Sequence, residues 1–458
     1  KKNTTTQKIG RVGIDILTSI KNIRLSYTEN NGTFLPGYIP EFGFLGRGNT
    51  SGALAPTFGF VFGSQANILD KALTNGWLLS RDLNDNYYSK NYSKSHFDKF
   101  DYSATIKPTR NLDIEIFGNR TFTKSFTQQL DVVNGAFNES PINAIGNFSI
   151  SYFMLKSSFK DKDVVFQEFK ENRAIISQRL ANKTGGNIDG FGSTNQDVVL
   201  PAFLAAYSGK SASAVQLSAF RDTPIPNWRI TYKGLMKIGW FKQNFRNVTL
   251  EHSYRSIYSV LSYTNNLKYD ANNPYGNSNR DIAENFNPQK LYNGVNLIEE
   301  FSPLIKVDFK MKNSFSLRAA YNKDKALNLN FNNNTITEIS GNEIIVGLGY
   351  RIKNVKMKFK TGNSTTKFQG DINFKADLGI RDNLTVIRAF GVSNDIDNNQ
   401  VTGGQNLISF KFLADYSLNK NLLASFFFDY NKSKFAISTT FPRTAINGGI
   451  SIRYIIGN

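Results

Sequence analysis

The sequence predicts an all-β protein, a transmembrane antiparallel β-barrel wall of about fourteen strands with a small helical extracellular insert. Three observations predict it. Apolar and polar residues alternate over runs of ten or more residues, aromatic residues crowd the ends of these runs, and turns of two or three residues at one end of the strands face long polar loops at the other. Outer-membrane barrels show this pattern, because alternate strand residues face lipid and lumen.

Seven short turns join the predicted strands in pairs, and each of them contains Asn. Asn suits a tight turn because it tolerates a positive φ and bonds its own backbone. The turns are Lys21-Asn22, Arg110-Asn111, Arg246-Asn247, Lys312-Asn313-Ser314, Lys353-Asn354, Arg381-Asp382-Asn383 and Asn419-Lys420-Asn421. The first strand is expected over Val12–Ile20. Residues 315–331 keep one parity, so we expect one long strand there and no turn at Asn322–Lys325.

The turn count divides the chain into wall segments and outer segments. Short turns belong to the periplasmic side of such barrels and long loops to the outside. Barrel hairpins are expected at residues 1–28, 99–121 and 228–263, with a ladder of hairpins at 301–458. Between them lie an extracellular insert at 29–98, a helix-bearing cap at 122–227 and an extracellular loop at 264–300.

The cap carries the helical patterns of this sequence. Asp163–Leu180 has apolar residues at helical spacing and stops before Gly185-Gly186. Asp197–Tyr207 begins at an acidic cap residue, with Pro201 in its first turn. Residues 147–155 alternate between apolar and polar like a strand. The number of turns, however, leaves no room for another strand across the wall at this point, unless residues 163–226 return to the other side through the lumen or the periplasm.

Alternation also assigns the two faces of each strand. Ile305, Val307 and Phe309 alternate with charged residues, which point to the opposite face of the strand, and the same pattern recurs in the later strands. A soluble sandwich would alternate in this way too, but the long strands, the aromatic ends and the asymmetry of turns and loops favour a barrel. The charged set is then expected to line a wet, basic lumen: Lys306, Asp308, Lys310, Lys356, Lys358, Lys375, Asp377, Lys411 and Asp415.

Composition narrows the class further. The 458 residues carry a formal charge of +19, but the Lys and Arg residues are dispersed along strands, which disfavours a nucleic-acid partner. The chain has no Cys, which excludes a disulfide framework and a thiolate metal site. No apolar run reaches the roughly 18 residues of a transmembrane helix. Lys1–Thr5 starts no signal peptide, so we expect a mature chain or part of a longer one.

No catalytic arrangement is predicted. The two histidines are His96, expected to be solvated in a polar loop, and His252, expected on the apolar face of its strand. Carboxylates alternate with Lys and Arg along strands, which is typical of a mixed-charge lining and not of an acid/base pair. We therefore expect no enzyme activity, no cofactor and no metal.

Several long strings resemble the SprA/Sov family, the giant outer-membrane translocons of type IX secretion and gliding motility in Bacteroidota. They are spread over the chain at Glu29–Gly37, Phe58–Gln65, Asn75–Leu78, Arg120–Thr123, Val199–Gly209 and Pro226–Tyr232. Members of this family are several times longer than 458 residues, so the resemblance implies the C-terminal portion of such a barrel, whose strands form an arc of a larger wall.

The resemblance also implies a function and partners. The family passes folded cargo with a C-terminal secretion domain through a very wide pore to the cell surface. Expected partners are the remainder of the same giant barrel, a PorV-like small barrel, a periplasmic plug protein, secreted cargo proteins and outer-membrane lipid. The alternatives are a fourteen-strand outer-membrane transporter of fatty acids or other small solutes and, less favoured, an outer-membrane hydrolase that would need His96 or His252.

Overall fold

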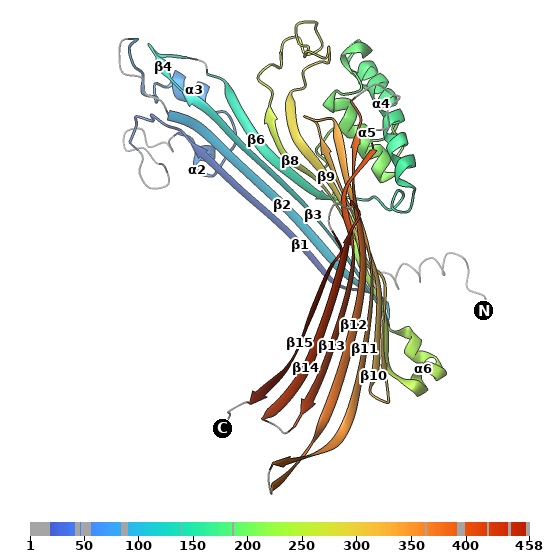
Figure 1. Cartoon of the computed structure of the whole chain (residues 1–458). Helices are drawn as coiled ribbons and strands as arrows, with labels where there is room; N and C mark the ends of the chain where they lie inside the picture. Colours follow the sequence, from blue (N-terminus) through green and yellow to red (C-terminus); the bar gives the residue numbers. More distant parts are fainter. Residues whose placement is uncertain are drawn as a thin grey trace, which may run out of the picture.

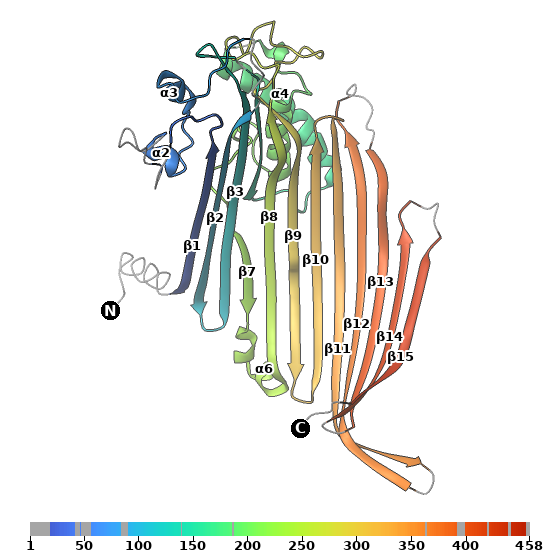
Figure 2. The same cartoon turned by 90° about the vertical axis from the view of Figure 1, so that its left-hand side faces the viewer.

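One large antiparallel sheet dominates the computed structural model, which describes residues 19–41, 46, 56–83, 90–138, 140–185, 187–361, 364–391, 399–418, 421–437 and 441–454. The sheet contains 13 strands, and their order follows the chain. It forms a single twisted layer with the two longest helices on one side (Figure 1), and Figure 2 shows the strands side by side. Most of the fold is therefore antiparallel β-structure.

The strands are long, and β11 reaches 27 residues. They are β1 (Ile20–Phe34), β2 (Lys90–Thr109), β3 (Leu112–Leu130), β6 (Ile142–Ser151), β7 (Asn227–Tyr232), β8 (Phe245–Asn265), β9 (Lys290–Met311), β10 (Phe315–Asn330), β11 (Thr335–Thr361), β12 (Ser364–Ala389), β13 (Asn399–Ser417), β14 (Leu422–Phe435) and β15 (Arg443–Tyr454). A separate hairpin pairs β4 (Val132–Val133) with β5 (Ala136–Phe137). Among the described residues, β1 and β15 form the two edges of an open sheet.

One row of the sheet is built from two separate strands. β6 pairs with residues 120–128 of β3 and with 257–264 of β8, whereas β7 pairs with 112–117 and 250–254 of the same two strands. Both run antiparallel to β3, so together they make one crossing. This explains the strand-like alternation near residue 150 without adding a crossing to the count.

The chain leaves the sheet between these two half-strands, and the junction is buried and hydrogen-bonded. Asn227 Nδ2 donates to Ser151 Oγ at 3.2 Å, and Ser151 Oγ donates to Asn119 Oδ1 at 2.9 Å. Ser151 is fully buried. Residues 152–226 between them form a helical insert, which is tied to the wall at both ends.

The insert contains α4 (Lys162–Thr184), α5 (Gln196–Ser208) and a short 3-10 turn, η2 (Ile188–Gly190). Asp161 caps α4 by accepting from the amides of Asp163 and Val164, and Gly185 ends it at a φ of 65°. Both helix predictions are confirmed. The cap of α5 differs, because the Asn195 side chain and not Asp197 accepts the amide hydrogen bond.

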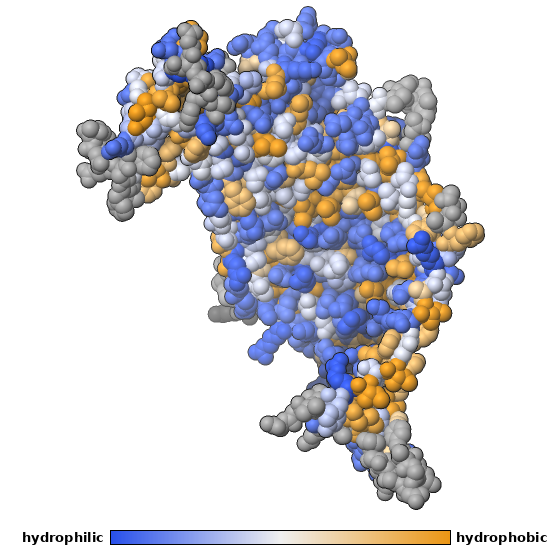
Figure 3. Space-filling view, turned by 60° about the vertical axis from the view of Figure 1, so that its left-hand side comes forward, coloured by the Kyte–Doolittle hydropathy of each residue, from blue (hydrophilic) through white to orange (hydrophobic). Residues whose placement is uncertain are grey.

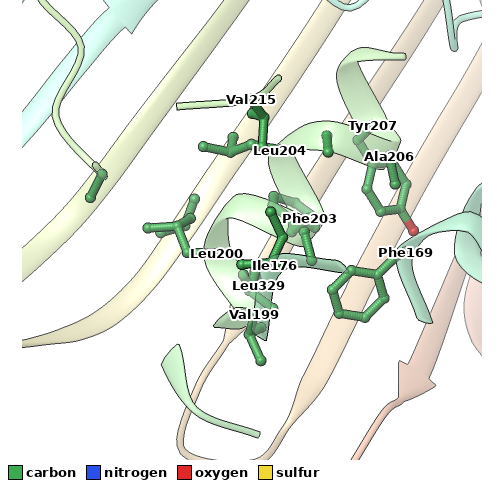
Figure 4. Close-up of a cluster of buried hydrophobic side chains, with 14 of the residues drawn as sticks. Phe169, Ile176, Val199, Leu200, Phe203, Leu204, Ala206, Tyr207, Val215 and Leu329 are labelled. Atoms are coloured by element: carbon green, nitrogen blue, oxygen red, sulfur yellow. The ribbon is translucent and has the colours of Figure 1, made fainter. Parts of the chain in front are cut away.

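The insert packs on one face of the sheet. Its core unites α5 with α4 and with apolar residues of β6, β8, β9, β10 and β11. Figure 4 shows Leu200, Phe203 and Leu204 of α5 in one cluster with Ile176 of α4 and Leu329 of β10. Twelve of the thirteen α5 residues are buried, which explains why this helix is apolar on every side.

Four small elements complete the fold. α2 (Phe58–Val61) and α3 (Leu69–Thr74) lie in the connection between β1 and β2, and a second apolar cluster joins α3 to the outer ends of β2 and β3. η3 (Gly234–Lys237) and α6 (Gly239–Asn244) join β7 to β8. The hairpin expected at 228–263, with its turn at Arg246-Asn247, required a strand through these residues, so that prediction is wrong beyond Tyr232.

The predicted turns are partly correct. β2 and β3 meet at Arg110-Asn111, and β9 and β10 meet at 312–314. β13 ends at Ser417 and β14 begins at Leu422, as the turn predicted at 419–421 requires, although residues 419 and 420 lie outside the described residues. The uninterrupted strand at 315–331 is confirmed by β10. The strands also reach well into the expected outer segments: β1 extends to Phe34 and β3 to Leu130.

The other four turns are wrong. Lys353-Asn354 is a bulge inside β11, where Asn354 has a φ of 57°. Residues 381–383 lie in the middle of β12, 246–247 lie within β8, and 21–22 lie at a bulge in β1. The bulge at Asn354 has a positive φ, which a tight turn also uses, so local sequence does not separate the two at that position. Where about fourteen strands were predicted, the described sheet has twelve strand positions side by side, because β6 and β7 share one position. Residues 12–18 of the expected first strand lie outside the described residues.

We expect Phe203→Ala to loosen the insert selectively. The Phe203 ring is fully buried and lies 4.9 Å from the Tyr207 ring, centroid to centroid. Its removal should lower the local unfolding free energy by about 3–5 kcal/mol. Hydrogen exchange of the α4 and α5 amides measures this. Ile175→Ala, at a residue 45% exposed on α4, is the control and should change it by less than about 0.5 kcal/mol; equal effects would contradict this packing.

Candidate functional site

The two faces of the sheet differ in chemistry, and one of them carries an apolar belt. Along the half of the strands nearer the short turns, aliphatic and aromatic residues pair across neighbouring strands and remain exposed. Ile450 is 75% exposed and Ile344 50%. The belt includes Leu112, Ile114 and Ile116 of β3, Ile305, Val307 and Phe309 of β9, Ile344–Ile352 of β11, Ile372–Ile380 of β12, Ile408–Tyr416 of β13 and Ile446–Tyr454 of β15, at alternate positions.

The height of the belt is close to that of a lipid bilayer. On β11 and β12 it runs from Ile344 to Ile352 and from Ile372 to Ile380, which pair directly. Nine residues match the roughly 9–11 that a tilted strand needs to cross the hydrocarbon core. A soluble protein rarely exposes so wide an apolar surface, so this face requires a non-aqueous neighbour.

The opposite face carries charges in register. One row across six strands joins Asp308, Arg318, Gly347, Asp377, Lys411 and Asp429. Lys306 Nζ lies 2.9 Å from carboxylate oxygens of both Glu251 and Asp308, and Arg318 Nε lies 3.3 Å from the second of these carboxylates. In Figure 3, hydrophilic residues spread over the middle of the molecule. This polar face is a mixed-charge surface.

Glycines of β11 let long side chains lie across the polar face. Arg381 Nη2 bonds Asp324 Oδ1 at 2.8 Å, from two strands away. The ion pair passes over Gly341, where an added Cβ would lie 2.7 Å from that Asp324 oxygen. Gly347 and Gly349 floor a depression of about 350 Å³ whose charged lining is Asp308, Lys310, Arg318, Lys375 and Asp377. This depression holds four of the nine residues singled out in the sequence: Asp308, Lys310, Lys375 and Asp377.

All nine predicted residues lie on the polar face. Lys306, Asp308, Lys310, Lys375, Asp377, Lys411 and Asp415 form one continuous area of β9, β12 and β13. Lys356 and Lys358 lie further along β11, beyond its bulge, on the hairpin that projects past the other strands in Figure 2. Within the described residues, Lys310, Lys375 and Lys411 form no ion pair, which leaves the basic excess expected of this wall.

A second charged group, which sequence reasoning missed, lies on the belt face at the base of the insert. We call it the seam. Glu299 and Glu338 are each 1% exposed, and Arg388 is 3% exposed. Arg388 Nη1 bonds Asp163 Oδ1 of α4 at 2.7 Å, and Arg388 Nε lies 3.5 Å from Glu338. Ser158 Oγ of the insert donates to Glu299 Oε1 at 2.5 Å.

The seam separates the exposed belt from the covered part of the same face. On β10 the apolar parity continues from Tyr321 to Leu327 but is broken by Lys323 and Lys325. Lys323 Nζ donates to the Ser158 carbonyl at 2.8 Å. That break was the available signal, since two lysines on an apolar strand face need carboxylate or carbonyl partners.

The histidines lie in strands. His96 is in β2 and not in a solvated loop, so that expectation is wrong: its ring nitrogens lie 2.6 Å from Asn31 Oδ1 and 3.1 Å from Asp98 Oδ2. His252 lies on the belt face, and its Nδ1 is 2.6 Å from the Leu304 carbonyl. No group of His, Asp and Glu able to hold a metal, and no helix long and apolar enough to cross a membrane, occurs among the residues that the structure describes.

Comparison with known proteins gives no family match, and two similar solved structures have low TM-scores. No protein-family model matches the chain, and no curated protein does. The structure of the RagAB peptide transporter is similar over 76% of this chain and 37% of that one, with 9% identity and a TM-score of 0.26. The ferric-catecholate import receptor Fiu from E. coli K12 is similar over 91% and 56%, with 10% identity and a TM-score of 0.23. The chain spans less than two thirds of either protein.

We expect the two charged groups to differ sharply in energetic weight. Arg388→Met leaves the buried Glu338 carboxylate with Lys162 at 4.0 Å, and should cost about 3–5 kcal/mol. Asp308→Asn removes a partly exposed partner, 24% accessible on the polar face, and should cost less than about 1 kcal/mol. Hydrogen exchange in α4 and in β10 measures both. A larger cost for Asp308→Asn would contradict the assignment of the polar face to water.

Proposed function

We propose that this chain forms part of the wall of an outer-membrane β-barrel through which folded proteins pass, as in the type IX secretion and gliding translocons that its sequence resembles. The observation that carries the proposal is the two-faced sheet. A belt of bilayer height is exposed on one face, and an ion-paired, hydrated surface covers the other. The belt contacts lipid and the polar face lines the lumen.

Lipid contact accounts for both the exposure and the hydrogen bonding of the belt. In hydrocarbon an unpaired backbone group costs several kcal/mol, so every wall strand needs neighbours along its length. Here β6 and β7 complete the row between β3 and β8, which keeps that row paired despite the insert. The long strands extend beyond the belt, and the insert covers their outer ends on the lipid-facing side, above the bilayer.

The orientation follows from the ends of the strands. The tight connections at 110–111 and 312–314 lie at the belt end of the sheet, whereas the insert and the 266–289 connection lie at the other. Short turns of outer-membrane barrels are periplasmic. The insert is then extracellular, and the lumen-facing row at Asp308 lies within the bilayer.

The polar face suits a conduit for folded protein. Its alternating charges hold water and offer no continuous apolar surface to which cargo would adhere. The free lysines 310, 375 and 411 make it basic, but in a wide lumen salt screens such charges beyond about 8–10 Å. We therefore assign these residues to hydration and weak attraction of acidic cargo, not to tight binding.

The open edges support a larger wall over a small closed barrel. β1 pairs with β2 and β15 pairs with β14, with no β1–β15 pairing among the described residues. Free strand edges accept another strand. We assign these edges to the remainder of the same giant barrel, with a PorV-like barrel, a periplasmic plug and secreted cargo as further partners. A self-contained transporter of fatty acids or small solutes would have to close on itself.

Thiol labelling tests the two faces, because the chain has no Cys. In the protein reconstituted into vesicles, a charged maleimide should label Ser409→Cys on the polar face much faster than Leu378→Cys on the belt, because lipid shields the belt. Both should react equally after denaturation. Equal rates in vesicles would place both faces in water and contradict a membrane wall.

Photo-crosslinking tests the conduit. A photoreactive residue in place of Lys411 should form adducts with a stalled folded cargo protein, because this side chain faces the lumen. The same residue in place of Ile450, on the lipid side, should form none. Adducts at neither position, together with uptake of a small solute, would support the transporter and overturn the translocon.

A further inference from the structure

The connection between β7 and β8 differs from the tight turns beside it. Residues 233–244 form η3 and α6, where the neighbouring turn has only 312–314. The connection folds onto the belt side of the sheet. The Trp240 ring lies 5.5 Å from the Phe245 ring, centroid to centroid, and the Phe245 ring lies 5.4 Å from that of Phe309 in the belt. Figure 1 shows α6 on the same side of the sheet as α4 and α5, at the opposite end of the strands.

This segment combines exposed apolar residues with cations alone. Ile238 is 52% exposed and Trp240 is 61% exposed, although both have apolar side chains. The segment 233–246 contains four cations and no carboxylate: Lys233, Lys237, Lys242 and Arg246. All four cations are exposed, and within the described residues neither Lys237 nor Lys242 forms an ion pair.

We propose that residues 233–246 form an interfacial anchor that binds the headgroups of anionic glycerophospholipids in the leaflet at the short-turn end of the barrel. The proposal rests on the proposed function, since it needs the belt to lie in a bilayer. Trp is favoured at the boundary between hydrocarbon and headgroups. Lysines beside it attract anionic lipid, and their effects add.

Continuity with the belt decides in favour of lipid as the occupant. Ring contacts join Trp240 to Phe245 and Phe245 to Phe309, so Trp240 continues the apolar surface of the belt. The exposed lysines 237 and 242 flank Ile238 and Trp240 in the sequence, and a combination of apolar and cationic residues is typical of segments that lie at a membrane interface. A surface made for an acidic protein partner would not need to continue the belt.

Tryptophan quenching tests the anchor, because the chain has three Trp residues, at 77, 228 and 240. Trp77→Phe/Trp228→Phe leaves a single reporter in α6. We expect brominated phosphatidylglycerol to quench it more strongly than brominated phosphatidylcholine in mixed vesicles that contain the full chain. Equal quenching by the two lipids would overturn the proposal.

Charge removal provides the matched control. In the variant that keeps only Trp240, the further substitutions Lys237→Gln/Lys242→Gln should lower the association constant for phosphatidylglycerol, relative to phosphatidylcholine, by about tenfold. The reason is that each lysine contributes separately to the attraction of anionic lipid. Lys183→Gln/Lys268→Gln removes the same charge from exposed positions at the other end of the molecule and should leave the preference unchanged. A similar loss in both double variants would indicate a general charge effect and overturn the anchor.

A second reporter separates this proposal from the proposed function. Trp77→Phe/Trp240→Phe leaves Trp228 of β7, which is stacked on Tyr254 on the belt face at a centroid distance of 4.5 Å. Both brominated lipids should quench it, because the belt contacts acyl chains of either. Quenching of Trp228 without lipid preference at Trp240 would overturn the anchor alone. No quenching of Trp228 would overturn the membrane wall as well.

Discussion

Backbone pairing under a wide apolar face is the constraint on which the rest of this structure depends. In the proposed bilayer, a sheet that exposes Ile344, Ile380 and Ile450 on one side would meet no water there to bond unpaired amides or carbonyls, so each strand needs a neighbour along the belt. The insert of residues 152–226 obeys this constraint. The chain leaves the sheet after β6 and resumes the same row with β7, and Ser151 and Asn227 hold the junction closed.

The belt face has an exposed part and a part covered by the insert, and the charged residues of the seam lie between the two parts. Below the seam the side chains are exposed and apolar; above it equally apolar residues, such as Leu327 and Leu329, are buried under α4 and α5. Within the seam Arg388 forms ion pairs with Asp163 and Glu338, and Glu299 accepts hydrogen bonds from Ser158 and Tyr254, where an unpaired charge would be costly. With α6 at the other end, the belt is bounded by charged residues above and below, as a bilayer requires.

Much of the wall was predictable from local pattern. The alternation of Ile305 with Lys306 assigned the faces correctly, because side chains of a strand point alternately to its two sides. All nine predicted polar residues share one face for that reason. The α4 helix was predictable from its apolar spacing and the glycine after it. The seam was not predicted, because Lys323 and Lys325 find partners in residues far away in sequence, such as Ser158 and Glu299.

The sequence by itself determined the strand periodicity, the two faces and the helical insert, since each depends on neighbours within a few residues. Tertiary structure alone decided whether Asn354 makes a turn or a bulge, because the outcome depends on whether β12 continues beside it. It also decided that residues near 150 and 228 share one row, because only a long β3 can pair with both. Strand pairing is non-local, and the number of strands in the wall is a property of that pairing.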